Sequence, residues 1–129
     1  MRYDPAVGAW GSGPFENDGA LDWMNELVAG ADLDEALRSA VTEAAYLDVD
    51  DGSRAFAAAE VVTAINGHPS RALPKELASH LSEHRMKPSK RRTTLALRAL
   101  ERVLADGSEL KELWGEGRDL EGESSVRSL

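Results

Sequence analysis

Glu60 is the one carboxylate inside RAFAAAEVVTAI, a run that is otherwise almost wholly apolar. A carboxylate in apolar surroundings costs free energy unless a donor or a cation pairs with it. Glu60 could be a general base tuned by its burial. It could instead accept N–H bonds from a loop or pair with an arginine. No histidine or serine is spaced nearby to complete a nucleophilic site, so the sequence favours the structural interpretation.

The loop AWGSGPFEND, residues 9–18, places two glycines just before the expected start of a helix. A phosphate-binding loop holds the phosphate with backbone N–H groups at a helix N-terminus. It usually adds a lysine or a hydroxyl that binds magnesium. Here Glu16 and Asp18 open the helix, and no cation lies between Arg2 and Arg38. Carboxylates at that end would repel a phosphate. The sequence therefore disfavours a phosphate site.

The same loop is better explained by packing within the protein. We expect Trp10 and Phe15 to fold onto the helix that carries Trp23, with Asn17 or its neighbour capping that helix. The loop amides would then bond the Glu60 carboxylate. If they do, Glu60→Leu should lower the free energy of unfolding by about 1–3 kcal/mol.

Two groups of acidic residues raise the possibility of a metal site, because calcium and magnesium prefer carboxylate oxygens. The loop DVDDG nevertheless departs from a calcium-binding EF-hand, since Gly52 takes the fifth place and Ala59 the twelfth. We expect a solvated acidic surface, with no metal and no cofactor. The acids concerned are Asp18, Asp22, Glu26, Asp48, Asp50 and Asp51.

His80 and His84 are four residues apart on an expected helix, a spacing that can bind zinc. The residue after His80 is Leu81 rather than the glutamate of a zinc protease, and no third ligand is evident. Surface histidines are the favoured interpretation.

Charge is unevenly distributed along the chain, whose net charge is −8. Residues 1–70 hold 13 acidic and 3 basic side chains, whereas residues 71–102 hold 9 basic and 3 acidic ones. The basic run has no aromatic residues for base stacking, and no recognised nucleic-acid motif is present. We favour a run that docks against the acidic half of the protein or is solvated. This candidate basic patch is Arg85, Lys87, Lys90, Arg91 and Arg92.

Helical spacing of apolar residues recurs along the chain, and strand signals are nearly missing. Aromatic residues make up only 5% of the sequence, and the apolar residues are mostly alanine, leucine and valine, which suits close helix packing. We predict an all-α fold, a compact bundle or short helical array of about five helices. The third should be the central helix, with Ser53 as its cap. The expected spans are 17/18–29, 33–47, 53–66, 74–84 and 90–105, with a last turn or two at 108–114.

The length of 129 residues fits one domain, which we place at residues 1–114, with a loosely ordered or incomplete tail at 115–129. Cysteine is absent, in keeping with a reducing cytoplasm. No apolar run approaches the roughly 20 residues of a membrane span, and the N-terminus lacks the apolar core of a signal peptide.

Three stretches resemble one family of bacterial proteins, the domain of unknown function 4259. They are GAWGSGPFENDGALDW, AAAEVVTAINGHP and LALRALERVLADGSELKELW, and with the acidic loop ending in Gly52-Ser53 they cover most of residues 8–114. The resemblance implies a small cytosolic bacterial domain and implies no activity.

Three classes of function are compatible with these observations. An acidic helical interaction module that binds another protein, such as an immunity or antitoxin-like factor, is favoured, because an acidic half would steer a basic partner. A nucleic-acid-associated regulator acting through the basic run is the second. A carboxylate- or metal-dependent hydrolase is the third, and it would need Glu60 beside Asp18 or Asp22 in a wet pocket. A role other than catalysis is favoured, with the enzyme question left open; we expect no membrane partner, and we leave the oligomeric state open.

Overall fold

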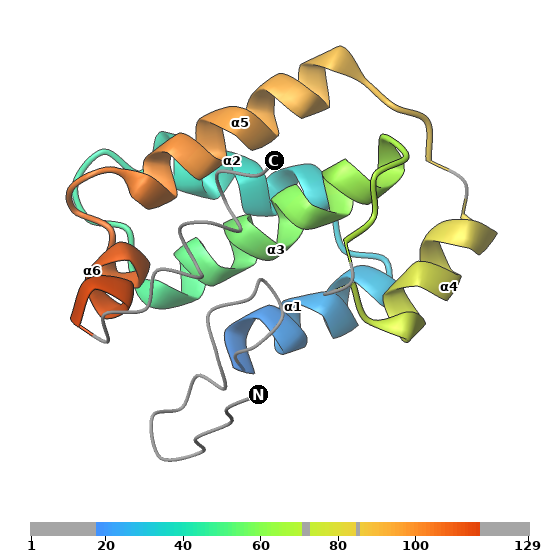
Figure 1. Ribbon diagram of the computed structural model, residues 1–129, viewed down its shortest axis with the longest axis horizontal. Coiled ribbons are helices and arrows are strands. Elements are labelled where there is room, and N and C mark those ends of the chain that lie inside the picture. The colour runs from blue at the N-terminus through green and yellow to red at the C-terminus, as the bar shows by residue number, and fades with distance from the viewer. Residues whose placement is uncertain (1–17, 71–72, 85, 117–129) are drawn as a thin grey trace.

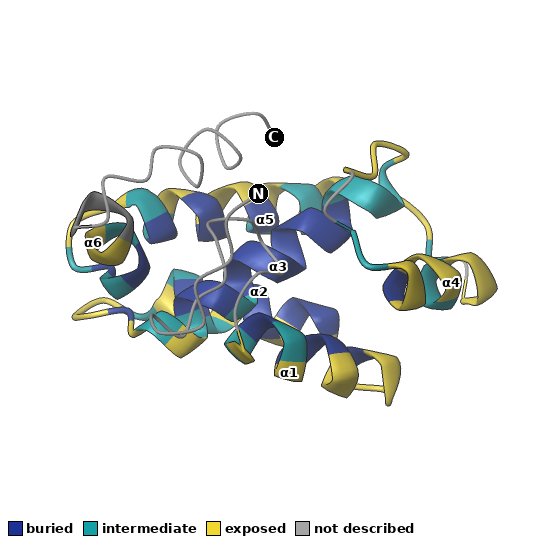
Figure 2. Ribbon diagram, turned by 60° about the horizontal axis from the view of Figure 1, so that its bottom comes forward, coloured by how far each residue is buried: buried dark blue, intermediate teal, exposed yellow. Residues whose placement is uncertain are grey.

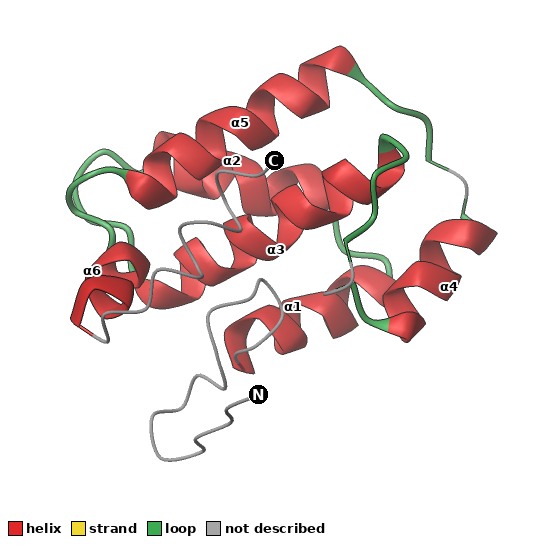
Figure 3. Ribbon diagram, viewed as in Figure 1, coloured by secondary structure: helices red, strands yellow, loops and turns green. Residues whose placement is uncertain are grey.

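A computed structural model of the chain describes residues 18–70, 73–84 and 86–116. Within these residues it contains six α-helices and no named strand (Figure 3). The predicted all-α class is confirmed, with six helices in place of about five, because the turns expected at 108–114 form a helix of their own. The helices are α1 (Asp18–Val28), α2 (Leu33–Thr42), α3 (Val49–Ile65), α4 (Lys75–Glu83), α5 (Lys90–Leu104) and α6 (Glu109–Glu116).

Helix α3 is the centre of the fold, as its almost continuous apolar sequence predicts (Figure 1). It packs against α1, α2, α5 and α6, and α2 also packs against α5. Residues 55–62 of α3 are all buried (Figure 2). Four of them are alanines, whose small side chains let neighbouring helices approach closely. Helix α4 lies at the periphery and anchors itself to the core through Leu77.

The start of α3 differs from its prediction. The helix begins at Val49, and the cap is Asp48, whose Oδ1 accepts the N–H of Asp51 at 2.8 Å. Ser53 is therefore not the cap but a buried residue in the second turn. An aspartate serves the positive end of a helix as well as a serine does, and the earlier start buries Gly52 against Leu110 of α6.

The end of α2 also differs from its prediction, since the helix stops at Thr42 rather than at residue 47. Leu47 leaves the helix to pair with the segment between α5 and α6: its N–H donates to Gly107 O at 2.8 Å, and its carbonyl accepts from Glu109 N at 2.9 Å. These backbone bonds hold Leu47 in the core at full burial. Long-range pairing of this kind overrides the helical spacing of the local sequence.

Arg102 of α5 ties the same two segments together. Its Nε donates to Glu43 O at 2.8 Å, and an Nη donates to Gly107 O at 3.2 Å. Gly107 has a φ of +81°, and a Cβ there would lie 3.1 Å from the carbonyl oxygen of Ala45. A glycine is therefore required where the two segments meet.

Among the described helices, none combines the length and the apolar character that a membrane span requires.

Candidate functional site

Glu60 lies at the start of the fourth turn of α3 with only 6% of its surface exposed. Its Oε2 is out of contact with solvent and has no hydrogen-bond partner in the part of the chain that the structure describes. No ion pair among the described residues includes Glu60 either. Buried polar groups are nearly always hydrogen-bonded, so an orphaned carboxylate oxygen marks a candidate binding position.

Phe56 and Ser53 share the stripe of α3 that carries Glu60, because they precede it by four and seven residues. Both are 1% exposed. The stripe that faces α5 and α6 lies roughly 100° around the helix: there Gly52 contacts Leu110, and Asn66 Nδ2 donates to Thr93 Oγ1 at 3.0 Å.

The loop expected to serve Glu60 lies outside the described residues, with Trp10, Phe15 and Asn17 in it. Its bonding to Glu60 stays a prediction. Trp23, the third aromatic residue of that hypothesis, is buried at 3% exposure on the inner face of α1.

The acids of α1 occupy the outer face of that helix. Asp18, Asp22 and Glu26 are all exposed, four residues apart, opposite the buried face that carries Trp23. None of the three takes part in an ion pair within the described residues. We call Asp18, Asp22 and Glu26 the acidic stripe. It does not share a surface with the buried carboxylate of Glu60.

A second acidic group gathers at the start of α3. Burial raises the pKa of Asp51, and the carboxylate of Asp48 raises it further, while Arg54 opposes both through an ion pair of 3.0 Å. Among the described residues, no group of three or more histidine, aspartate or glutamate side chains is arranged to hold a metal ion.

The raised pKa of Asp51 makes a prediction for Asp51→Asn. Because the folded protein holds the Asp51 proton more tightly than the unfolded chain does, the ionised form costs stability at pH 7. We expect the variant to gain less than about 1 kcal/mol in free energy of unfolding at pH 7, since solvent screens the charges. The gain should shrink as the pH falls through the raised pKa. Urea unfolding at pH 7 and pH 4 measures it, and a loss at pH 7 would contradict it.

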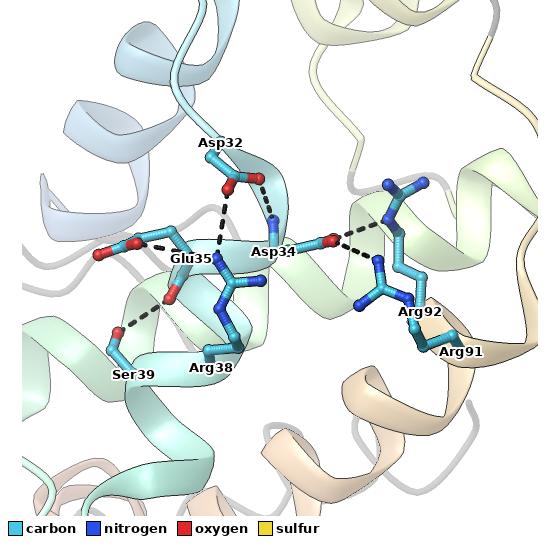
Figure 4. A network of polar contacts seen from close by, with 7 residues as sticks. All are labelled: Asp32, Asp34, Glu35, Arg38, Ser39, Arg91 and Arg92. Carbon is cyan, nitrogen blue, oxygen red and sulfur yellow. Dashed lines mark hydrogen bonds and ion pairs between the residues drawn. The ribbon is translucent and has the colours of Figure 1, made fainter.

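Asp34 is the second buried acid among the described residues, and both of its carboxylate oxygens accept hydrogen bonds from arginines (Figure 4). Its side chain, 8% exposed, joins the second residue of α2 to the start of α5. Arg92 Nε donates to Oδ1 at 2.7 Å, and an Nη of Arg91 donates to Oδ2 at 3.2 Å. Burial raises the pKa of Asp34, but the hydrogen bonds and charges of Arg92 and Arg91 outweigh it and hold the pKa below its ordinary value.

The pairing with Asp34 divides the candidate basic patch. Arg91 and Arg92 dock against an acid of the N-terminal half, the arrangement that the sequence favoured over nucleic-acid contact. Arg85 lies outside the described residues, whereas Lys87 and Lys90 are exposed. A shallow hollow of about 440 Å³ at this end of α5 is lined by Asn66, Pro88, Ser89, Lys90, Thr93 and Thr94.

The sequence analysis missed two residues that link distant parts of the fold, Asp34 and Arg102. Asp34 does fall three and seven residues before Leu37 and Val41, on the edge of the apolar face of α2. That position signals a partly buried acid. Nothing in the local sequence marks Arg102 as a link to Glu43, because the Glu43 carbonyl that accepts from its Nε lies 59 residues away.

The histidines of α4 lie at the surface end of that helix. The rings of His80 and His84 stack with centroids 4.2 Å apart, and His84 Nδ1 lies 3.0 Å from the carbonyl oxygen of His80.

Comparison with known proteins identifies a family. The family model for a domain of unknown function, DUF4259, matches residues 8–124. No curated protein matches the chain, and no solved structure does.

Proposed function

We propose that this chain, which belongs to the DUF4259 family, is a cytoplasmic protein-interaction module that binds a partner with a basic surface. The acidic stripe carries the proposal. Its three carboxylates are exposed, evenly spaced along one helix face, and not committed to any ion pair among the described residues. An immunity or antitoxin-like factor would use such a surface, and a bacterial source would suit that role.

The charge of the region around the stripe supports the same proposal. Residues 18–70 hold 11 acidic and 2 basic side chains, a formal difference of −9. Both basic residues are already paired, Arg38 with Asp32 at 3.3 Å and Arg54 with Asp51 at 3.0 Å. Acidic side chains still outnumber cations in this half after Asp34 pairs with Arg91 and Arg92, and such negative fields accelerate association with a cationic surface and select partners.

The two other functions have less support. A nucleic-acid regulator would need the basic run to face a phosphate backbone, but Arg91 and Arg92 are paired with Asp34. A hydrolase would need Glu60 near Asp18 or Asp22, and these acids occupy the outer face of α1 whereas Glu60 is buried in α3.

The test is capture of partners from a native lysate by the full chain and two charge-matched variants. The first variant is Asp18→Asn, Asp22→Asn, Glu26→Gln, which removes the acidic stripe. The control is Glu76→Gln, Glu83→Gln, Glu101→Gln, which removes three exposed acids from α4 and α5. Mass spectrometry quantifies each captured protein in low and high salt.

We expect a protein with a basic surface that the wild type and the control retain and the stripe variant recovers at least about tenfold less. Equal capture by all three proteins would contradict the proposal. Nucleic acid recovered only at low salt would transfer the function to the candidate basic patch.

A further inference from the structure

We propose that His80 and His84 form a surface binding site for a divalent transition-metal ion such as zinc. The two histidines lie one helical turn apart at the C-terminal end of α4, with their ring centroids 4.2 Å from each other. His84 is exposed and His80 is half-buried, so the pair is open to solvent. The spacing lets two imidazoles bind one ion, and the structure adds the contact between the rings.

A hydrogen bond to the backbone prepares His84 as a ligand. Its Nδ1 lies 3.0 Å from the carbonyl oxygen of His80. A carbonyl oxygen accepts, so Nδ1 donates in this contact, and the lone pair of the neutral ring is on Nε2. Metal-binding histidines usually donate their second ring N–H to a carbonyl or a carboxylate, which fixes the tautomer and the ring orientation. This hydrogen bond can therefore persist when Nε2 binds an ion.

His80 supplies the second nitrogen. Its ring is tilted by 30° relative to the ring of His84, and its side chain makes no hydrogen bond within the described part of the chain. Turning the His80 ring about its own side-chain torsions directs a nitrogen toward an ion on Nε2 of His84. The turn exchanges a ring contact at the surface for a coordination bond and breaks no hydrogen bond of the described residues.

The ligand atoms select the class of ion. Imidazole nitrogens suit zinc, copper and nickel, whereas magnesium and calcium prefer oxygen ligands. The described residues add no third histidine, aspartate or glutamate that could complete the pair. Water would fill the other coordination positions, so the site is open and its ion exchanges with solvent.

The place of the pair gives a bound ion an effect on α4. This helix lies at the periphery, most of its residues are exposed, and Leu77 is its buried residue (Figure 2). An ion held by His80 and His84 clamps the last turn, and positive charge is favourable at the C-terminal end of a helix. An ion that binds the folded turn alone stabilises it by mass action. We therefore expect bound metal to hold the end of α4 more firmly.

The test titrates zinc chloride into the full chain and follows the backbone amide signals of α4 by NMR, with magnesium chloride as the control ion. The variants His80→Gln and His84→Gln each remove one imidazole. The matched control is His68→Gln, which removes the third histidine of the sequence from an exposed position after α3. Thermal unfolding without metal establishes that each variant is folded.

We expect saturable zinc-dependent shifts centred on residues 80–84, and none with magnesium. Affinity should fall at least about tenfold in His80→Gln and in His84→Gln, because either loss ends chelation, and should stay unchanged in His68→Gln. Amide hydrogen exchange in the last turn of α4 should slow about tenfold when free zinc is about ten times its dissociation constant.

Equal affinity in the wild type and in either variant of the pair would overturn the inference, as would the absence of saturable shifts in α4. Zinc that binds all four proteins alike would be an adventitious ion only. Neither histidine belongs to the acidic stripe, so loss of the metal site would leave the proposed function intact. Loss of stripe-dependent capture would equally leave the metal site intact.

Discussion

Replacing Asp34 with alanine is expected to lower the free energy of unfolding by about 2–3 kcal/mol. The substitution removes a carboxylate that is 8% exposed and leaves two arginines without their partner. Arg92, at 20% exposure, cannot easily regain water, whereas Arg91, at 71%, can. The expected loss therefore stays below that of a fully buried ion pair.

Urea unfolding at pH 7 measures this loss, with Glu35→Ala as the control. Glu35 is an exposed acid in the same first turn of α2, and its contact with Arg38 is 3.9 Å long. Surface pairs of that kind contribute little to stability. A loss in Asp34→Ala no larger than that in Glu35→Ala would show that the Asp34 pairing does not hold α2 to α5.

The pH dependence of the same contribution has a definite sign. Because the folded protein holds the pKa of Asp34 below its ordinary value of 3.8, the unfolded chain takes up the proton first as the pH falls. The contribution of Asp34 is thus complete above pH 3.8 and is lost as the pH drops through the folded value. The wild type and Asp34→Ala should therefore converge in stability only in strong acid.

Glu60→Leu is expected to raise the free energy of unfolding by about 1–3 kcal/mol, the opposite of the sequence-based expectation. The Oε2 of Glu60 has no partner among the described residues, so the substitution removes no bond that those residues make. A leucine of similar size removes the uncompensated carboxylate from the centre of α3 and adds apolar burial.

Chemical unfolding of Glu60→Leu, compared with Glu101→Leu at an exposed position of α5, gives the measurement. A loss of 1–3 kcal/mol in Glu60→Leu would contradict this expectation and restore the hypothesis that loop amides bond Glu60. A gain in the free energy of unfolding would show that Glu60 lowers the stability of the fold, as residues kept for binding often do.

The sequence predicted the helices well where apolar spacing and capping agree. Helix α5 begins and ends within a residue of its expected span, because Ser89 caps it and its Oγ accepts the N–H of Arg92 at 3.2 Å. The central place of α3 also followed from its composition. Both features depend on local chemistry, which a single sequence displays directly.

The sequence failed where distant segments meet. The early end of α2 depends on Leu47 pairing with the backbone around Ser108, about sixty residues away. The bond between Asp34 and Arg92 joins residues 58 apart. The candidate site shares this difficulty, because the helical run shows that Glu60 is buried but cannot show whether a partner reaches it.

The most direct test of the central claim is the rate at which a captured partner associates with the chain across a series of salt concentrations. We predict that the rate falls steeply with salt for the wild type and for the Glu76, Glu83 and Glu101 control. The variant that lacks Asp18, Asp22 and Glu26 should associate more slowly at low salt and depend less on salt. The same rate and the same salt slope for all three proteins would show that the acidic stripe does not recruit the partner.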